Sequence, residues 1–294
     1  MKTITIAGGT GLIGRALEKS FTAEGYQVLI LTRNVRKENH VYWDPSKKEI
    51  ELEKIKQTDV LINLSGEGIA DKPWSSKRKK ELLSSRKGTN EFLFECSDKL
   101  VDLKMFVSAS GVNCYGYGWD TQEHVEEDPY GEDFLSVLVK QWEESADLFS
   151  SKCKVAKIRT SVVLDRKGGA LEKLVKPIKW GLGAPLGTGK QAMPWIHIDD
   201  LAGIYLHVVQ HEFSGTFNAA TGNESNRTMT KEIAGVLQKS LFLPAVPAFT
   251  LKMYFGEMAE MLLENVLVSN EKIISTGYVF KFPDLRSALQ NVLD

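Results

Sequence analysis

Glycines recur at positions 8, 11 and 14, between the apolar run Thr3–Ala7 and a helical pattern of apolar residues. A strand, a glycine-rich turn and a helix in this order suit a dinucleotide. Glycine permits the tight turn, the close approach of a pyrophosphate and the packing of helix on strand. Free N–H groups at the start of the helix attract the phosphates. The loop therefore predicts a dinucleotide cofactor, held by Gly8, Thr10, Gly11, Leu12, Ile13 and Gly14.

A basic residue follows the second apolar run, Gln27–Leu31, which ends at Thr32 and Arg33. NAD-selective folds commonly place a carboxylate here, where it accepts hydrogen bonds from the ribose hydroxyls. A guanidinium instead grips a 2′-phosphate through paired, charge-assisted hydrogen bonds. We therefore predict NADP(H) as the cofactor, with Arg33 at its 2′-phosphate. The alternative is a surface arginine in a polar loop.

Small residues close the third apolar run, Asp59–Leu64, at Ser65 and Gly66. They allow a backbone to approach a ligand closely, although they are also common in turns. We expect Leu64, Ser65 and Gly66 to lie along the adenosine half of the cofactor.

An arginine lies on the apolar stripe of the next predicted helix, where Arg86 shares a face with Leu82 and Leu93. A buried charge needs an anionic partner, because an unpaired one is costly. The partner is either a cofactor phosphate or an internal carboxylate such as Glu81. Arg159, on the fifth predicted strand, poses the same question.

The apolar runs alternate with helical patterns along the first two-thirds of the chain. Short, near-continuous apolar strands in such an alternation indicate a parallel sheet covered on both faces, with ligands at the carboxyl ends of its strands. The predicted strands are Thr3–Ala7, Gln27–Leu31, Asp59–Leu64, Lys104–Ser108 and Lys154–Val163, and the predicted helices span about 74–100 and 133–152. The fold class predicted is α/β, a doubly wound parallel Rossmann sheet.

The character of the chain changes after residue 165. Gly, Pro and Lys are frequent up to residue 194, and helical patterns dominate from Thr228 onward. We predict a Rossmann domain over 1–165, with 194–222 also packing on it, and a smaller, mainly helical substrate-side domain over 166–193 and 223–294. Trp195–Ile198 is predicted to be a short strand, after which Asp199 and Asp200 cap a helix.

Composition narrows the class of partners. The 294 residues carry 37 Lys and Arg against 38 Asp and Glu, so nothing favours nucleic acid or an anionic membrane surface. Three cysteines without ligand spacing predict free thiols and no metal site, and no apolar run reaches membrane length. The glycine loop begins a few residues after Met1, so we expect no signal peptide. We expect a cytoplasmic protein with a small-molecule substrate, and a homodimer is left open.

Several strings resemble the extended short-chain dehydrogenase/reductase superfamily, in its sugar-nucleotide epimerase-like branch. Besides the glycine loop they include Asn63-Leu64-Ser65-Gly66 and Ser108-Ala109-Ser110, followed by Tyr115-Gly116. Others are similar to one atypical subfamily, the epimerase family proteins: Trp43-Asp44, Ser85-Arg86, Gly168-Gly169 and the stretch from Pro194 to Ala202. The resemblance implies a bound NADP(H), with Thr32, Arg33, Leu64, Ser65, Glu81, Arg86 and Arg159 along it.

One departure from this superfamily concerns its catalytic residues. Its working enzymes carry a Tyr-x-x-x-Lys pair on the helix after the serine strand, in which tyrosine transfers the proton and lysine lowers the pKa of the tyrosine. Here no tyrosine stands four residues before a lysine, and the residue four positions before Lys140 is Ser136. Ser110 and Tyr115 are the candidates for orienting a carbonyl and for proton transfer. The alternative for Tyr115 is a packing aromatic.

On the substrate side, Gly187 and Lys190 can approach a polar or anionic ligand, and Trp195 offers a stacking face. His197 has a near-neutral pKa suited to acid–base work. The alternatives are a glycine-rich connector and a hydrogen-bonded structural histidine. We expect an NADP(H)-dependent oxidoreductase or isomerase of a small polar substrate, with a nucleotide sugar among the candidates. The alternative, favoured by the missing Tyr–Lys pair, is a non-catalytic NADP(H)-binding sensor or interaction protein.

Overall fold

A computed structural model describes residues 2–118 and 122–293. Eight strands form one large sheet in the order β10–β7–β6–β5–β1–β2–β3–β4, in which only the pairing of β3 with β4 is antiparallel. The strands are β1 (Thr3–Ala7), β2 (Gln27–Thr32), β3 (His40–Asp44), β4 (Glu49–Ile50), β5 (Val60–Asn63), β6 (Met105–Gly111), β7 (Lys154–Thr160) and β10 (Gly215–Ala219). The chain winds outward on both sides of β1. The switch point between β1 and β5 is where such sheets bind ligands.

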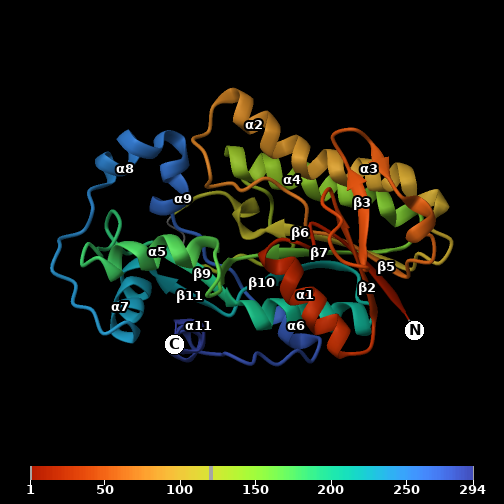
Figure 1. Cartoon of the computed structure of the whole chain (residues 1–294). Helices are drawn as coiled ribbons and strands as arrows, with labels where there is room; N and C mark the ends of the chain where they lie inside the picture. The colour runs from red at the N-terminus through yellow and green to blue at the C-terminus, as the bar shows by residue number, and fades with distance from the viewer. Residues whose placement is uncertain (1, 119–121, 294) are drawn as a thin grey trace.

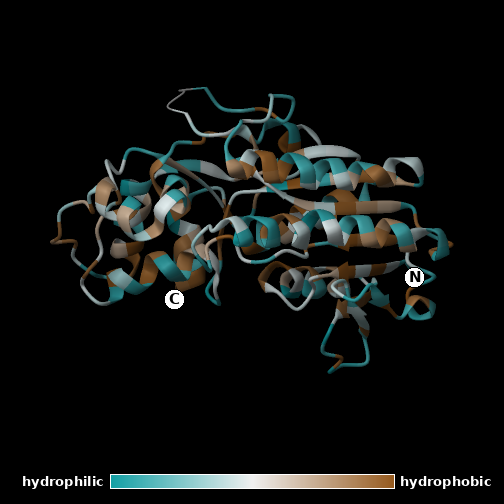
Figure 2. Ribbon diagram, turned by 90° about the horizontal axis from the view of Figure 1, so that it is seen from above, coloured by the Kyte–Doolittle hydropathy of each residue, from teal (hydrophilic) through white to brown (hydrophobic). Residues whose placement is uncertain are grey.

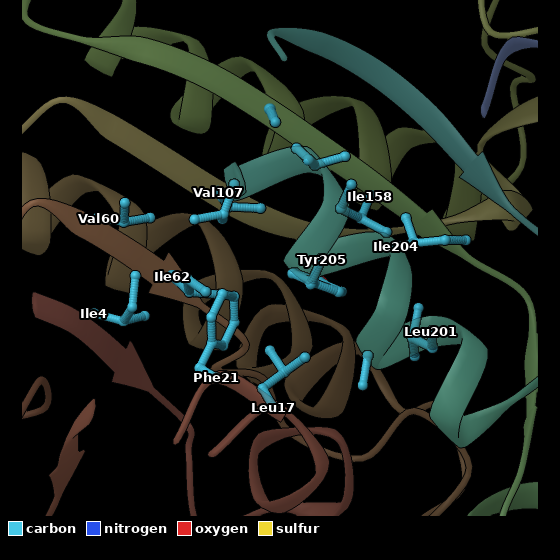
Figure 3. Packing of buried hydrophobic residues seen from close by; sticks show 14 of the residues in the cluster. Ile4, Leu17, Phe21, Val60, Ile62, Val107, Ile158, Leu201, Ile204 and Tyr205 are labelled. Atoms are coloured by element: carbon cyan, nitrogen blue, oxygen red, sulfur yellow. The ribbon is translucent and has the colours of Figure 1, made fainter. Parts of the chain in front are cut away.

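Helices cover both faces of this sheet (Figure 1). On one face lie α1 (Leu12–Ala23) and α6 (Ile198–Gln210), and on the other lie α2 (Ser76–Leu83), α3 (Thr89–Cys96) and α4 (Phe134–Asp147). Figure 3 shows Ile4 of β1, Ile62 of β5 and Val107 of β6 in one core with Phe21 of α1 and Tyr205 of α6. The strands carry long hydrophobic stretches, while the covering helices alternate hydrophobic and hydrophilic positions (Figure 2). This pattern is what burial on both faces requires of a parallel sheet.

A smaller region lies at one end of the molecule (Figures 1 and 2). Its own three-stranded sheet, in the order β11–β9–β8, consists of β8 (Val162–Leu164), β9 (Ala192–His197) and β11 (Gly222–Ser225). The helices of this region are α5 (Gly169–Lys179), α7 (Asn226–Val236), α8 (Ala248–Phe255), α9 (Glu260–Leu263) and α11 (Leu285–Leu293). The short helix α10 (Glu271–Ser275) returns to the large sheet, where Ile273 joins its core. Trp195, Leu171 and Met229 belong to a separate core between this sheet and its helices.

The predicted fold class is confirmed: the large sheet is almost wholly parallel, and the C-terminal region is mainly helical. Three details of the prediction were wrong. The edge strands β3 and β4 were not expected, the predicted helix over 74–100 is interrupted by the π-helical segment Ser84–Gly88, and the predicted strand Lys154–Val163 divides between two sheets at Ser161. The division at Ser161 lies within one continuous strand pattern, so the pairing of β7 and β8 in different sheets decided it.

The expected cap of α6 is also corrected. His197 is the N-cap, and its Nδ1 accepts a hydrogen bond from the N–H of Asp199 at 3.0 Å. Asp200 is fully buried, and its carboxylate accepts hydrogen bonds from the backbone N–H groups of Lys281 at 2.6 Å and Phe282 at 3.0 Å. This carboxylate therefore fastens the segment before α11 to α6.

Across residues 2–118 and 122–293, no helix combines the length and the apolar character needed to cross a membrane. Within the same residues, no group of three or more His, Cys, Asp or Glu side chains is arranged to hold a metal ion. These findings concern the described part of the chain only.

We predict that Asp200→Ala lowers the free energy of unfolding by about 2–4 kcal/mol, because it strands buried N–H donors that had a charged acceptor. Asp199→Ala is the matched control: its carboxylate is exposed and, among the residues that the structure describes, binds only Lys281, at 3.3 Å, so its loss should change stability by less than about 1 kcal/mol. Urea unfolding of both variants measures the difference. Equal effects of the two substitutions would contradict the fastening role of Asp200.

Candidate functional site

The glycine loop joins the end of β1 to the start of α1. Gly8 has a φ of +76°, and the N–H of Gly11 donates to its carbonyl at 3.1 Å. A Cβ on Gly14 would lie 2.4 Å from the Cα of Gly9, so only glycine lets α1 pack this closely on the loop. Gly11 is the N-cap of α1 and has no side chain to cap it. The first N–H groups of the helix are therefore left for another acceptor, as an anion site requires.

A cavity of about 910 Å³ opens at the carboxyl ends of β1, β2, β3 and β5. It lies within the range of volumes that hold small molecules and cofactors. Of the residues predicted to bind the cofactor, those that line it are Gly8, Thr10, Gly11, Thr32, Arg33, Leu64, Ser65, Gly66 and Glu81. Leu12, Ile13, Gly14, Arg86 and Arg159 are not among the residues that line it. Of these, Gly14 acts through the packing of α1.

Arg33 projects from the end of β2 as an exposed side chain. Its guanidinium makes no hydrogen bond or ion pair with any other residue in the described ranges, although it lines the cavity. Thr32 turns the chain here, since its Oγ1 accepts from the N–H of Asn34 at 3.1 Å. The expected free cation at the end of the second strand is therefore present.

The far wall of the cavity comes from β3 and α3 and was missed from the sequence. Trp43 stacks on Phe92 with ring centres 5.9 Å apart. Asp44 accepts hydrogen bonds from the hydroxyl and N–H of Ser46 at 2.6 and 3.0 Å, and these bonds, helped by the positive charges of Lys47 and Arg33, hold the pKa of Asp44 below its ordinary value. Trp43-Asp44 was noted as a family string, but no periodic pattern placed it on a strand.

Arg86 is a buried cation whose guanidinium has two backbone carbonyls and the hydroxyl of Ser85 as hydrogen-bond acceptors and lies over the ring of Trp142. Its guanidinium donates to the oxygens of Leu82 at 3.1 Å and Glu67 at 2.9 Å. Burial, together with the charge of Arg78, lowers the pKa of Arg86 to about 10. Glu81 does not pair with it but with Arg78, at 3.2 Å, so the internal-carboxylate alternative is wrong for Glu81.

Gly66 lies between the cavity and this cation and packs closely against it. Gly66 lines the cavity, and a Cβ on it would lie 3.0 Å from the guanidinium carbon of Arg86. The Nε of Arg86 is buried and has no hydrogen-bond partner among the described residues. With a pKa of about 10, this buried arginine keeps its positive charge at neutral pH, and Gly66 brings the cavity close to it. The residues present therefore fit a dinucleotide phosphate.

Arg159 holds a buried ion pair instead of facing the cavity. Its Nε donates to Oε1 of Glu143 at 2.8 Å, and its second terminal nitrogen donates to Oε2 at 2.9 Å. Both side chains are almost completely buried. Burial acts to raise the pKa of Glu143, but the hydrogen bonds and charge of Arg159 outweigh it and hold that pKa below the ordinary value. The predicted position of Arg159 along the cofactor is corrected to a place in this buried network.

Ser110 and Tyr115 belong to the same network. The hydroxyl of Ser110 donates to Oε1 of Glu143 at 2.5 Å, and the phenol of Tyr115 accepts from Arg159 at 2.9 Å and donates to Asn218 at 2.7 Å. Both side chains are buried, and burial raises the pKa of the Tyr115 phenol. The structure thus brings the two catalytic candidates together, but with hydroxyls already bonded to protein groups.

A second tyrosine, which sequence reasoning missed, shares the carboxylate of Glu143. The phenol of Tyr130 donates to Oε2 at 2.7 Å, opposite the oxygen that Ser110 uses. Tyr130 is half-buried, whereas Tyr115 is buried. Its signal in the sequence is its place just before α4, in the string Pro129-Tyr130-Gly131, but it stands ten residues before Lys140 and so outside the Tyr-x-x-x-Lys spacing.

The predicted substrate-side residues divide into two groups. Lys190 is exposed. Gly187 lies in a turn with a φ of +56°, and its N–H donates to the carbonyl of Val246 at 2.9 Å. Trp195 is only 1% exposed and lies in the core of the smaller region, so it offers no stacking face there. His197 is equally buried, and burial lowers its pKa. Its role in capping α6 corrects the acid–base expectation.

Comparison with known proteins gives the family. The sequence model of the NAD dependent epimerase/dehydratase family matches residues 4–136, and a model described as a domain of unknown function, DUF1731, matches residues 246–292. The chain is 33% identical over 297 residues to epimerase family protein SDR39U1 of Mus musculus, covering 99% of both chains. It belongs to the epimerase family proteins. Epimerase family protein YfhF of Bacillus subtilis is 32% identical, with 99% of this chain and 97% of that one covered.

A solved structure of another member supports the fold. Human epimerase family protein SDR39U1 (isoform 2), crystallised with NADPH, has a TM-score of 0.89 and 31% identity, covering 99% of this chain and 98% of that chain. The match includes the smaller C-terminal region as well as the Rossmann sheet. The resemblance drawn from the sequence is therefore confirmed as membership of this family.

We predict that Glu143→Gln lowers the free energy of unfolding by about 3–5 kcal/mol at neutral pH, because it leaves Arg159 buried without its counter-charge. Folding lowers the pKa of Glu143 below its ordinary value of 4.5, so its contribution is complete above that value and is lost as pH falls through the folded-state pKa. The difference in free energy of unfolding between wild type and variant should therefore become smaller as the pH falls, which denaturant unfolding at several pH values measures.

The exposed neighbour Glu144 supplies the control for this experiment. Glu144→Gln should change stability by less than about 1 kcal/mol at every pH. If the difference in free energy of unfolding between wild type and Glu143→Gln stays constant from neutral to acidic pH, the ion pair is not its cause. A packing defect would not depend on the protonation of a carboxylate.

Proposed function

We propose that this epimerase family protein binds NADP(H) in the cavity above the glycine loop and acts as an oxidoreductase or isomerase on a small polar substrate. The observation that carries the proposal is the pairing of an uncapped helix start at Gly11 with the unpaired, cavity-lining guanidinium of Arg33. The first suits a pyrophosphate and the second suits a 2′-phosphate. NADPH in the human relative supports the same choice of cofactor.

Each part of the cavity has a role in this proposal. The N–H groups at the start of α1 hold the pyrophosphate, and Leu64, Ser65 and Gly66 bring backbone to the cofactor without bulky side chains. Arg86 lies behind Gly66 and supplies positive charge beneath a phosphate. Trp43, on the stacked pair with Phe92, forms an apolar wall for the adenine end. A bound nicotinamide would supply hydride transfer.

For proton transfer we propose the hydroxyls gathered around Glu143. Ser110 and Tyr130 bind separate oxygens of its carboxylate, and Tyr115 bonds Arg159 on the other side of the ion pair. Tyr130, being half-buried, is the best placed of the three to meet a substrate. Ser110 then orients the substrate oxygen, and Tyr115 keeps Arg159 in position. Members of the epimerase/dehydratase family are usually enzymes, which supports a reaction of this kind.

A non-catalytic NADP(H)-binding sensor or interaction protein is the second candidate. The observation that favours it is the burial of Ser110, Tyr115 and Glu143 in bonds to each other and to Arg159. A hydroxyl that is satisfied by protein groups must break a bond before it can serve a substrate. Cofactor binding is common to both candidates, and only turnover separates them.

The cofactor proposal predicts that NADPH binds at least about tenfold more tightly than NADH, because a guanidinium–phosphate contact of about 1.5–3 kcal/mol is added. Arg33→Glu should abolish or invert this preference, whereas Arg36→Glu, on an exposed side chain that does not line the cavity, should preserve it. Titration of cofactor fluorescence measures both affinities. Equal binding of NADPH and NADH by the wild type would refute the role of Arg33.

The proton-transfer proposal predicts that Tyr130→Phe lowers kcat by about 10²–10⁴-fold while leaving the Kd of NADPH unchanged. A substrate is first sought among aldehydes, ketones and nucleotide sugars, with turnover measured as the change in NADPH absorbance. Ser110→Ala and Tyr115→Phe are tested in parallel, with Tyr26→Phe, beside Phe21 and remote from the network, as control. Full turnover in all three network variants would remove the assignment. NADPH binding without turnover on any substrate would favour the sensor.

A further inference from the structure

A groove lies between α1 and α6, which are neighbours on one face of the large sheet (Figure 1). Its volume of about 460 Å³ is within the range of sites that hold small molecules. One stripe of α1 forms the first wall, because steps of three and four residues bring side chains to the same face of a helix. The residues of this stripe are Leu12, Arg15, Ala16, Lys19, Ser20 and Ala23.

The other walls of this α1–α6 groove come from α6, from the segment before α5 and from the segment before α11. Their residues are Ile198, Asp199, Ala202, Asp165, Lys167 and Lys281. Among the described residues, none that lines the groove also lines the cavity at the glycine loop. The α1–α6 groove is therefore separate from the cavity in which we place the cofactor.

Contacts within the chain hold these walls in place. The carboxylate of Asp200 accepts a hydrogen bond from the N–H of Lys281 at 2.6 Å, which fastens the segment before α11 to α6. A Cβ on Gly169 would lie 3.3 Å from the side chain of Leu12, so the segment that carries Lys167 packs on the first turn of α1. The groove is thus preformed in the folded chain.

Positive charge dominates the α1–α6 groove. Four cationic side chains line it against two carboxylates, although the whole chain has a formal net charge of −1. One of the four cations, Lys281, is paired with the carboxylate of Asp199 at 3.3 Å. The other three cations carry charge that this pair does not balance.

These three cations, Arg15, Lys19 and Lys167, form no ion pair with any residue in the described ranges. Within the same ranges, the side chains of Lys19 and Lys167 also make no hydrogen bond. The guanidinium of Arg15 donates from Nη1 to the carbonyl of Thr10 at 2.7 Å, which leaves its other N–H donors for a ligand. The three charges are therefore available to an anion.

We propose that the α1–α6 groove binds a small polyanion, namely a phosphorylated or polycarboxylate molecule. A planar guanidinium forms paired hydrogen bonds with phosphate or carboxylate oxygens, and lysines add point charges. A cleft lined by charges of one sign focuses the potential and attracts the opposite ion from solution. Ser20 adds a hydroxyl to the same wall. Two or more negative charges on the ligand match the three unpaired cations that line the groove.

Isothermal titration calorimetry of the full chain at low ionic strength tests this proposal, with inorganic pyrophosphate and citrate as probes. We expect saturable binding of at least one probe, and the tighter one distinguishes phosphoryl from carboxylate chemistry. Lys19→Glu and Lys167→Glu should each raise the Kd by at least about tenfold, because repulsion replaces attraction. Both side chains are exposed, so the melting temperature should stay close to that of the wild type.

Lys231→Glu is the matched control, because it makes the same change of net charge at an exposed position of α7, outside the groove. It should change the Kd of the probe by less than about threefold. Absence of saturable binding by both probes overturns the proposal. So does binding that both groove variants leave unchanged, or that Lys231→Glu weakens as much as they do.

The titration is repeated with excess NADPH to separate the groove from the glycine loop. Probe binding should persist, since the two sites share no lining residue. Displacement of the probe by NADPH places it in the cofactor cavity and overturns the proposal. Failure of NADPH to bind contradicts the cofactor proposal alone, because the effects of Lys19→Glu and Lys167→Glu are measured without it.

Discussion

The close packing of the first helix on the first strand positions everything that the candidate site uses. A Cβ on Gly14 would come within 2.4 Å of the Gly9 backbone, and this contact sets how near α1 lies to the end of β1. With α1 there, its uncapped N-terminus faces the cavity at the switch point of the sheet. A larger residue at position 14 would push the helix away and move the anion site with it. The smaller region depends on the same frame, because α6 packs against α1 before the chain leaves for α7.

A second constraint is the buried ion pair between Glu143 and Arg159. It joins α4 to β7 and is surrounded by hydroxyl groups of Ser110, Tyr115 and Tyr130. Removing either partner of a buried ion pair is strongly destabilising, so the bonds between Glu143 and Arg159 hold α4 on β7 in the folded chain. The helix on which the superfamily keeps a Tyr–Lys pair carries Glu143 here, and its carboxylate is paired with Arg159 of β7. The groups that surround this ion pair are the hydroxyls of Ser110, Tyr115 and Tyr130.

The difference between what the sequence predicted and what the fold contains follows from the range of the interactions. Thr3–Ala7 and the glycine spacing were predicted correctly because period and turn chemistry are local properties. The strand β3 was missed because its burial comes from neighbours such as Phe92, far along the chain. The carboxylate partner proposed for Arg86 was wrong, since Glu81 lies one turn away on the same helix but turns toward Arg78. Local spacing shows which residues share a helical stripe, and rotamers and neighbouring loops decide which charges meet.

The sequence by itself determined the fold class, the family and the chemistry of the loop at residues 8–14. Hydrophobic periodicity and glycine spacing are properties of short, continuous segments, so they can be recognised without the tertiary structure. It also located Arg33, because this residue directly follows the second apolar run of the sequence. Only the tertiary structure decided that Ser110, Tyr115 and Arg159 share one buried network with Glu143. It also decided that Trp195 and His197 serve as core and cap. These side chains are separated by long stretches of chain, and their partners depend on which strands lie next to one another in the sheet.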